Sequence, residues 1–332
     1  MHKFDEKALL KSAEDTLALK PEIEKIVDDI CKEGYKNIFL IGVGGTICYA
    51  WQMEAIVKAH STIDLTVVHA ADYLSMGYKR LTKDTIVICE SASGDTKEIV
   101  AAIEKVHSIG AKVIGLCDKP ESPVGKSVDY RIGCPDSDGM YKWYVLMCRF
   151  MKNNGDFDQY DEFFKDMANL PAACIEVSKA CDEKTMEFAK MHADDDVVHY
   201  LVGSGNLWGG TYSEAMCLME EMQWMRTKSI TAGDLFHGTI EIIDPDTSML
   251  LFFGEDETRP QMQRVLDFLP RINKNHWVFD TKDYELKGIR PEFRGLVSPI
   301  VMWAVNMRLA NNLELMRCHP LEVRRYYRKL KY

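Results

Sequence analysis

The stretch FLIGVGG at residues 39–45 decides the fold, because it recurs as YLVGSGN at residues 200–206. The two stretches lie 161 positions apart, and Gly44 aligns with Gly205. An apolar run that ends in closely spaced glycines is typical of a strand entering a tight turn before a helix. Self-similarity at a fixed spacing predicts a duplicated structural unit.

Further apolar runs extend the repeat on both sides. Runs without polar alternation, separated by helical stretches, predict parallel sheets that helices cover on both faces. The expected strands are residues 37–42, 64–70, 85–90, 112–118 and 129–134 in the first series, and 197–203, 249–254, 276–281 and a short one near 295–299 in the second. The predicted fold class is therefore α/β, with two tandem parallel sheets, each flanked by helices in a flavodoxin-like manner.

The domain organisation follows from length and periodicity. A chain of 332 residues suits two domains. Helical spacing of apolar residues covers positions 5 to about 33, with Pro21 opening a second helix. We expect an N-terminal helical arm at residues 1–35, a first module at 36–165 and a second module at 166–332.

Composition excludes several classes of protein. A formal net charge of -10 argues against nucleic-acid binding, which depends on clustered Lys and Arg. The ten cysteines form no C-x-x-C pair and no zinc-ligand spacing. We therefore expect no metal site, and we expect the protein to work in a reducing compartment. No apolar run reaches the length of a membrane span, and the charged start does not resemble a signal peptide. We expect a cytoplasmic protein.

The turn SASGDT at residues 91–96 follows an expected strand and precedes an expected helix. One interpretation is a helix cap provided by Ser93 or Asp95. The other is an anion site, in which the hydroxyls of Ser91, Ser93 and Thr96, the backbone at Gly94 and the helix N-terminus surround a phosphate. This stretch alone leaves both interpretations open.

A second glycine-rich turn, GVGGT at residues 42–46, follows the first expected strand. Gly44 and Gly45 allow backbone to approach a ligand and Thr46 offers a hydroxyl, but Ile47 occupies the third glycine place of a dinucleotide fingerprint. In the second copy the turn equivalent to residues 91–96 contains GEDET, whose three acids disfavour a phosphate. Only the first copy is expected to bind an anion.

These two turns, without a lysine-containing phosphate loop, resemble those of the sugar isomerase (SIS) domain family. The resemblance extends over nearly the whole chain from about residue 36. Within this family, the sequence is similar to the isomerase half of glucosamine-6-phosphate synthase. It implies that the two turns hold the phosphate of a hexose 6-phosphate. The implied phosphate-binding residues are Ser91, Ser93, Thr96, Gly44, Gly45 and Thr46.

The resemblance also assigns a catalytic pair. Glu221 lies sixteen residues ahead of His237, which precedes Gly238, and the synthase-like family has a glutamate and a histidine at this spacing. An imidazole suits proton shuttling in sugar-ring opening, and a carboxylate in a water-poor pocket suits proton transfer between C1 and C2. Glu220 is the alternative base, because only the spacing favours Glu221.

Two further segments, HGTIEIIDP at 237–245 and CHPLEVRRYYRKLKY at 318–332, resemble those of fructosamine 6-phosphate deglycases, including fructoselysine-6-phosphate deglycase. Leu218 stands where the synthase family has a lysine, which puts synthase-type isomerisation in doubt. Contacts to substrate or tail are implied for Glu241, His319, Arg324 and Tyr326. Acids such as Glu241 and the GEDET turn favour a lysine-like amine, whereas Arg324 and Arg325 equally favour an acidic one.

The implied activity is hydrolysis of a ketosamine 6-phosphate to a hexose 6-phosphate, expected to be glucose 6-phosphate, and a free amine, without cofactor or metal. The resemblance implies a homodimer or higher homo-oligomer with shared active sites, and no membrane or nucleic-acid partner. The alternatives are an aldose–ketose phosphate isomerase and a non-catalytic sugar-phosphate sensor.

Overall fold

The computed structural model describes residues 1–194 and 196–331. Its chain divides into two compact units. One is Lys7–Pro171, called here the N-terminal unit; the other, the C-terminal unit, combines Met1–Glu6 with the residues from Ala172 onward. The expected boundary after residue 165 lies a few residues before this division. None of the helices in the described residues combines the length and the apolar character that a bilayer crossing requires.

The N-terminal unit contains a five-stranded parallel sheet with the order β2-β1-β3-β4-β5. The strands are β1 (Asn37–Gly42), β2 (Leu65–His69), β3 (Thr85–Glu90), β4 (Lys112–Leu116) and β5 (Tyr130–Ile132). Every residue of β1 and β3 is buried, as expected for central strands covered on both faces. All five predicted strands of this unit are confirmed, and the order is flavodoxin-like.

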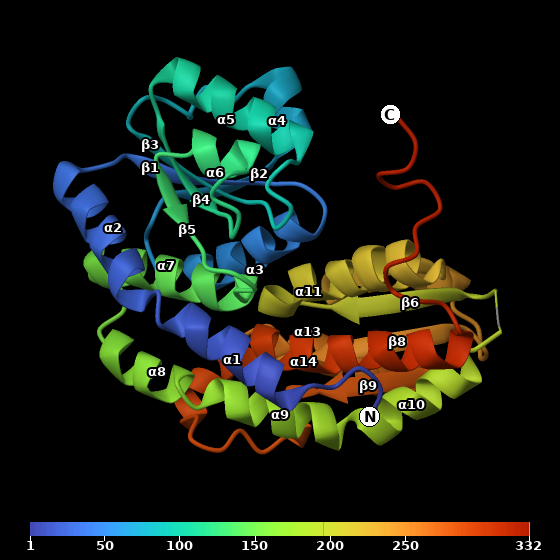
Figure 1. Cartoon of the computed structure of the whole chain (residues 1–332). Coiled ribbons are helices and arrows are strands. Elements are labelled where there is room, and N and C mark those ends of the chain that lie inside the picture. Colours follow the sequence, from blue (N-terminus) through green and yellow to red (C-terminus); the bar gives the residue numbers. More distant parts are fainter. Residues whose placement is uncertain (195, 332) are drawn as a thin grey trace. The chain divides into compact units, whose positions relative to one another are not determined.

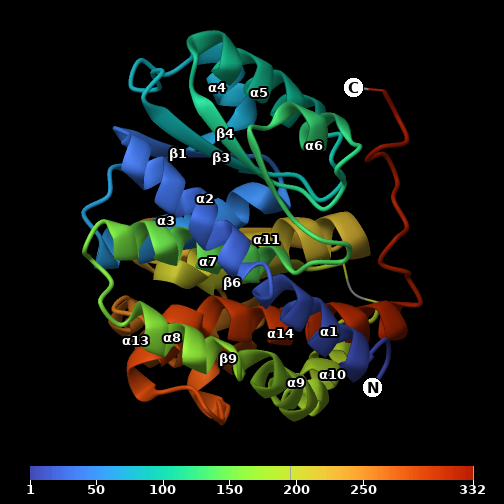
Figure 2. The ribbon, with the colours of Figure 1, turned by 60° about the vertical axis from the view of Figure 1, so that its left-hand side comes forward.

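Helices cover both faces of this sheet, as Figures 1 and 2 show. Those on one face are α4 (Ala70–Met76), α5 (Lys97–Ile109) and α6 (Pro123–Ser127); those on the other are α2 (Lys20–Glu33), α3 (Gly45–His60) and α7 (Gly139–Asn153). The remaining helices before residue 181 are α1 (Glu6–Leu17), α8 (Tyr160–Met167) and α9 (Leu170–Ala180), of which α9 lies mostly in the C-terminal unit. The predicted N-terminal helix pair is confirmed as α1 and α2, and Pro21 stands in the first turn of α2.

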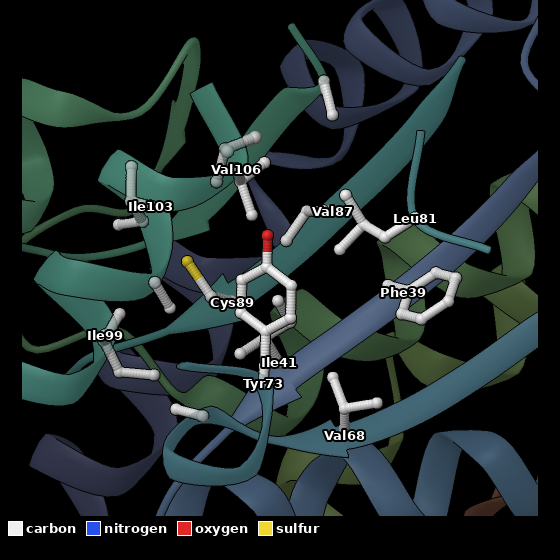
Figure 3. Packing of buried hydrophobic residues seen from close by; sticks show 14 of the residues in the cluster. Phe39, Ile41, Val68, Tyr73, Leu81, Val87, Cys89, Ile99, Ile103 and Val106 are labelled. Carbon is white, nitrogen blue, oxygen red and sulfur yellow. The ribbon is translucent and has the colours of Figure 1, made fainter. Parts of the chain in front are cut away.

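A single apolar cluster joins the sheet to α4 and α5 (Figure 3). The sheet contributes Phe39, Ile41, Val87 and Cys89, and the helices contribute Tyr73, Ile99, Ile103 and Val106. All are at most 2 % exposed. Burying a large apolar side chain stabilises a fold by roughly 1.5–3 kcal/mol, so this cluster holds β1 and β3 firmly and fixes the turns that follow them.

The C-terminal unit contains a four-stranded parallel sheet with the order β7-β6-β8-β9. The strands are β6 (Val198–Gly203), β7 (Arg226–Thr231), β8 (Ser248–Phe253) and β9 (His276–Asp280). Numbered from its own first strand, this sheet repeats the order of the other. The helical elements are α10 (Asp182–Met191), η1 (Gly205–Leu207), α11 (Trp208–Ser213), η2 (Glu214–Met222), α12 (Ala232–Leu235), η3 (Thr239–Ile242), α13 (Arg259–Phe268), η4 (Leu269–Arg271), η5 (Thr281–Asp283) and α14 (Pro291–Arg317).

Strand β7 was not predicted from the sequence. It reads RTKSIT, and none of its six residues is fully buried, because it forms the edge of the sheet beside β6. An edge strand needs no continuous apolar run, and charged residues are common on sheet edges. The polar composition of β7 therefore concealed it.

The strand expected near residues 295–299 is wrong, because these residues lie inside α14. Pro299 lies in the interior of α14, where a proline lacks the N–H that would bond the carbonyl four residues earlier. Here that carbonyl, on Gly295, accepts a hydrogen bond from Asn206 Nδ2 at 2.8 Å. The side chain replaces the missing backbone donor and the helix continues.

The strand registers confirm the duplication. Cα partners in the first sheet pair Ile41 with Cys89, and those in the second pair Val202 with Leu251. The offset is 161 positions between β1 and β6 and 162 between β3 and β8. Residues 91–96 therefore align with 253–258, and the first residues before the following helices, Thr96 and Thr258, coincide.

Glu90 ends β3 and is a buried carboxyl next to the 91–96 turn. Trp143 Nε1 donates a hydrogen bond to its Oε2 at 2.8 Å, and a methyl group added at Gly139 would lie 2.5 Å from its Oε1. Burial raises the pKa of Glu90 to about 7, although nearby Lys142 and the Trp143 hydrogen bond act in the opposite direction. The folded protein therefore retains this proton at pH values where the unfolded chain has lost it.

This raised pKa predicts a pH-dependent stability difference between the wild type and Glu90→Gln. Between the ordinary pKa of 4.5 and about 7 the folded state binds more protons than the unfolded state, so wild-type stability falls as pH rises. As pH rises across this window, the free energy of unfolding of the variant should increase by on the order of 3 kcal/mol relative to that of the wild type. Chemical denaturation at pH 5 and pH 8 measures the effect.

The matched control is Glu104→Gln, because Glu104 is exposed on α5. Its free energy of unfolding should stay within about 0.5 kcal/mol of that of the wild type at both pH values. If the difference in unfolding free energy between Glu90→Gln and the wild type is the same at both pH values, the raised pKa of Glu90 is contradicted.

Candidate active site

The turn at residues 42–46 joins β1 to α3. Gly44 directly precedes α3 with φ 60°, in the left-handed region that favours glycine. A methyl group added at Gly44 would meet no atom within 4 Å, so the space in front of this backbone is open. The Thr46 hydroxyl faces its own turn, where it donates to the Val43 carbonyl at 2.9 Å and accepts from the Val43 N–H at 3.3 Å.

The turn at residues 91–96 joins β3 to α5 and gathers three hydroxyls. Thr96 Oγ1 lies 3.1 Å from Ser91 Oγ and 3.5 Å from Ser93 Oγ. Thr96 precedes α5, and its side chain makes no capping hydrogen bond. Thr96 therefore occupies the N-cap position, rather than Ser93 or Asp95 of the simpler sequence interpretation. The hydroxyls instead face one another at a helix N-terminus, where the helix dipole favours an anion.

Both turns lie at the same edge of the N-terminal sheet. They follow β1 and β3, which are hydrogen-bonded parallel neighbours. The chain continues from β1 to β2 on one side, whereas β3 lies on the other. This reversal is a topological switch point, where ligands bind in open α/β sheets. The two turns that carry the six residues predicted to hold a phosphate therefore lie at one switch point of the sheet.

The equivalent turns of the C-terminal unit contain an anion supplied by the protein itself. Asp256 Oδ2 accepts a hydrogen bond from the Asn206 N–H at 2.8 Å. Asp256 Oδ1 accepts from the Thr258 N–H at 2.9 Å and from the Thr258 hydroxyl at 2.6 Å. A carboxylate thus satisfies the backbone and hydroxyl donors at this switch point.

The duplication identifies the matching donors in the N-terminal unit. Asn206 aligns with Gly45, and Thr258 aligns with Thr96. A methyl group added at Gly205 would lie 2.3 Å from Asp256 Oδ2, whereas the same addition at the equivalent Gly44 meets open space. Gly94 replaces Asp256 in the N-terminal copy, so the donors remain but the internal carboxylate is gone. The space beside Gly205 is filled by the Asp256 carboxylate, whereas the space beside Gly44 is open.

The acidic turn of the C-terminal copy is engaged within its own unit. Glu255 forms an ion pair with Arg294, at 2.9 Å from Nε to Oε2 and 2.8 Å from Nη2 to Oε1. Its backbone N–H donates to Ser298 Oγ at 3.0 Å. Asp256 and Glu255 are thus engaged within their own unit, whereas Glu257, the third acid of the turn, is exposed.

Glu221 and its alternative Glu220 lie in different environments at the end of η2. The Glu221 side chain is 29 % exposed, and its Oε1 accepts a hydrogen bond from Arg324 Nε at 2.8 Å. Glu220 is exposed and accepts from Thr227 Oγ1 of β7 at 2.5 Å. The less exposed position of Glu221 suits a base in a water-poor site better than that of Glu220.

The helix that carries Glu221 is itself unusual. Element η2 has π-helical geometry over nine residues, and such segments are rare and occur frequently at functional sites. It contains Glu214, which is fully buried and whose pKa burial raises well above its usual range. Burial also raises the pKa of Cys217 to about 11. Cys217 is therefore a neutral thiol at neutral pH.

The other predicted residues of the C-terminal unit do not form one cluster. His237 is exposed in the turn after α12, where its N–H donates to the Asp234 carbonyl at 2.9 Å. Glu241 is exposed on η3, and Tyr326 is 61 % exposed. His319 lies against Trp224 with ring centroids 4.2 Å apart. Arg324 contacts Glu221, an ion pair that no sequence signal indicated.

Within residues 1–194 and 196–331, no group of three or more His, Cys, Asp and Glu side chains is arranged to hold a metal ion. A groove of about 600 Å³ on α13 is lined by Arg259, Arg264, Phe268 and Arg271, among others, and contains none of the predicted site residues.

The comparisons with known proteins agree with this fold. Residues 34–140, about a third of the chain, match the SIS domain family. Over 96 % of its length it is 28 % identical to fructosamine deglycase FrlB of Bacillus subtilis strain 168, with 99 % of that protein covered. It is 22 % identical to fructoselysine 6-phosphate deglycase of Escherichia coli K12, with 92 % and 90 % covered.

Among solved structures, one from Bacillus subtilis, provisionally named a phosphosugar isomerase, superimposes with a TM-score of 0.88. It is 26 % identical, and the match covers 96 % of this chain and 100 % of that one. The named relatives support a sugar-phosphate-processing enzyme.

The hydroxyls of the 91–96 turn can be tested by binding. The double variant Ser91→Ala/Ser93→Ala should weaken binding of glucose 6-phosphate at least tenfold, or about 1.4 kcal/mol, because it removes two donors to the phosphate. Calorimetric titration measures the dissociation constant. Ser75→Ala, which removes a hydroxyl bonded to its own helix at Ala71, should bind normally. Unchanged binding by the double variant would reject the phosphate assignment.

The internal carboxylate of the C-terminal copy can be tested by stability. Asp256→Ala leaves the N–H groups of Asn206 and Thr258 and the Thr258 hydroxyl without their acceptor, and should lower the free energy of unfolding by about 2–4 kcal/mol. Asp246→Ala, at an exposed position, should change it by less than about 0.5 kcal/mol. Denaturant titration distinguishes them, and equal effects would show that Asp256 is not a structural anion.

Proposed function

We propose that the protein hydrolyses a ketosamine 6-phosphate, such as fructoselysine 6-phosphate, to a hexose 6-phosphate and a free amine. The observation that carries the proposal is the contrast between the two switch points. The C-terminal one contains the Asp256 carboxylate, whereas its N-terminal equivalent has the same donors and open space at Gly44. The similarity to two named deglycases over more than nine-tenths of the chain supports this reaction over others.

One set of protein groups binds the phosphate of the substrate, and another set transfers protons at its other end. The phosphate is bound by the Gly45 N–H, by Thr96 and by the hydroxyls of Ser91 and Ser93. At the other end, His237 transfers a proton from the anomeric hydroxyl to the ring oxygen and opens the ring. Glu221 then removes a proton from C1, which carries the amine, and a proton returns at C2.

These proton transfers convert the ketosamine into an aldose imine. Water adds to the imine carbon, and the carbon–nitrogen bond breaks. The products are the free amine and an aldose 6-phosphate, for which we propose glucose 6-phosphate. The sequence of steps consumes one water and involves no net oxidation.

We further propose that the protein works in the cytoplasm as a homodimer or larger homo-oligomer with shared active sites. In that arrangement the exposed His237 would act on substrate bound mainly by a neighbouring subunit. Light scattering determines the mass in solution, and a monomer that turns over substrate would contradict shared sites.

The function is tested by supplying purified protein with a panel of fructosamine 6-phosphates and following glucose 6-phosphate release with a coupled dehydrogenase. Glu221→Gln keeps the size of the side chain but removes the base, so kcat should fall at least about a hundredfold while hexose 6-phosphate still binds. Glu220→Gln is the matched control, one position away and exposed, and should retain near-normal kcat.

Other outcomes distinguish the alternatives. Conversion of glucose 6-phosphate to fructose 6-phosphate without amine release would indicate an aldose–ketose isomerase, a possibility that the similar solved structure raises. Hexose 6-phosphate binding without turnover of any ketosamine would indicate a sensor. Loss of activity in Glu220→Gln rather than Glu221→Gln would exchange their roles.

A further inference from the structure

The residues that follow α14, called here the tail, return to the end of η2. Cys318 ends the helix in the left-handed conformation, with φ 50°. The His319 carbonyl accepts a hydrogen bond from Gln223 Nε2 at 2.8 Å. The His319 ring lies 4.2 Å from that of Trp224, and the Arg325 guanidinium lies 4.2 Å from the same indole. The tail is therefore anchored two to three positions after Glu221.

The anchor residue is held in an unfavourable backbone conformation. Trp224 has φ 55°, where a bulky side chain is a genuine outlier. Such conformations persist only where surrounding contacts enforce them, and they cluster at functional sites. The contacts of the indole with His319 and Arg325 provide that enforcement. The attachment of the tail to η2 is thus a built feature rather than a loose surface contact.

Arg324 uses this attachment to reach Glu221. Its Nε donates to Glu221 Oε1 at 2.8 Å. Its Nη1 donates to the carbonyls of Val323, at 3.1 Å, and Leu321. The side chains of Arg324 and Glu221 are 18 % and 29 % exposed. The guanidinium is therefore fixed by its own loop before it meets the carboxylate, and less side-chain entropy is lost than in an ordinary surface pair.

We propose that Arg324 is the positioning residue for Glu221. It holds Oε1 of the carboxylate, so that Oε2 faces the substrate carbon in one orientation. This inference rests on the proposed role of Glu221 as the base. A reacting group held in its productive geometry gains rate without a gain in substrate affinity. Loss of Arg324 therefore lowers kcat rather than raising KM.

An opposite role is also testable. If the tail were an inhibitory strap, with Arg324 withholding the carboxylate from substrate, removal of the guanidinium would increase activity. The two roles differ in the sign of the change in kcat, so a single variant decides between them.

The test uses the full chain and steady-state kinetics with the best substrate of the fructosamine 6-phosphate panel. Arg324→Ala should lower kcat by about thirtyfold or more with KM within about threefold. Arg324→Lys should retain an intermediate kcat, because an ammonium restores the charge but not the geometry of the guanidinium. Added methylguanidinium should partly restore the kcat of Arg324→Ala, which a general loss of folding would not allow.

The matched control is Arg226→Gln, which breaks an exposed ion pair with Asp196 in the same unit and should leave kcat unchanged. Unchanged or increased kcat in Arg324→Ala, together with an inactive Glu221→Gln, would overturn the positioning role and leave the proposed function standing. A wild type without turnover on any ketosamine 6-phosphate would overturn the proposed function, and this inference with it.

Discussion

In each sheet of this protein, the N–H and hydroxyl donors at the switch point need hydrogen-bond acceptors. Parallel strands end at one edge, and the helices that follow them begin there with unpaired backbone N–H groups and the positive end of their dipoles. Buried donors without acceptors are costly. The C-terminal unit resolves this with the carboxylate of Asp256, and the N-terminal unit has Gly94 at the aligned position. In the proposed function, the phosphate of the substrate binds to the corresponding donors of the N-terminal unit.

The internal carboxylate organises the rest of its unit. With Asp256 bonded to Asn206 and Thr258, the adjacent Glu255 pairs with Arg294 of α14. The Asn206 side chain donates to the Gly295 carbonyl that Pro299 leaves free. A methyl group added at Gly295 would lie 2.9 Å from the Glu255 carbonyl. These contacts join the acidic turn to a long helix, and they engage two of its three acids, Glu255 and Asp256.

Sequence reasoning predicted the buried strands, and it suggested the two turns as a phosphate site, because the signals of both are local. Apolar runs mark β1 and β3, and glycines with hydroxyls mark the turns after them. The reasoning missed β7, whose edge position requires no apolar run, and misassigned residues 295–299, because the donor that replaces the missing proton of Pro299 is 93 positions away at Asn206. The pairing of Arg324 with Glu221 spans 103 positions and depends on tertiary contacts that no local pattern encodes. The choice of Glu221 over Glu220 rested on spacing alone, and the different exposure of the two carboxylates now supports it.

The most direct test of the central claim is a crystal structure with glucose 6-phosphate bound. We predict phosphate oxygens within hydrogen-bonding distance of the hydroxyls of Ser91 and Thr96 and of the Gly45 N–H, with the Asp256 turn unchanged. A phosphate bound at the Asp256 turn, or against Arg264 and Arg271 in the groove on α13, with the 91–96 turn empty, would contradict the account.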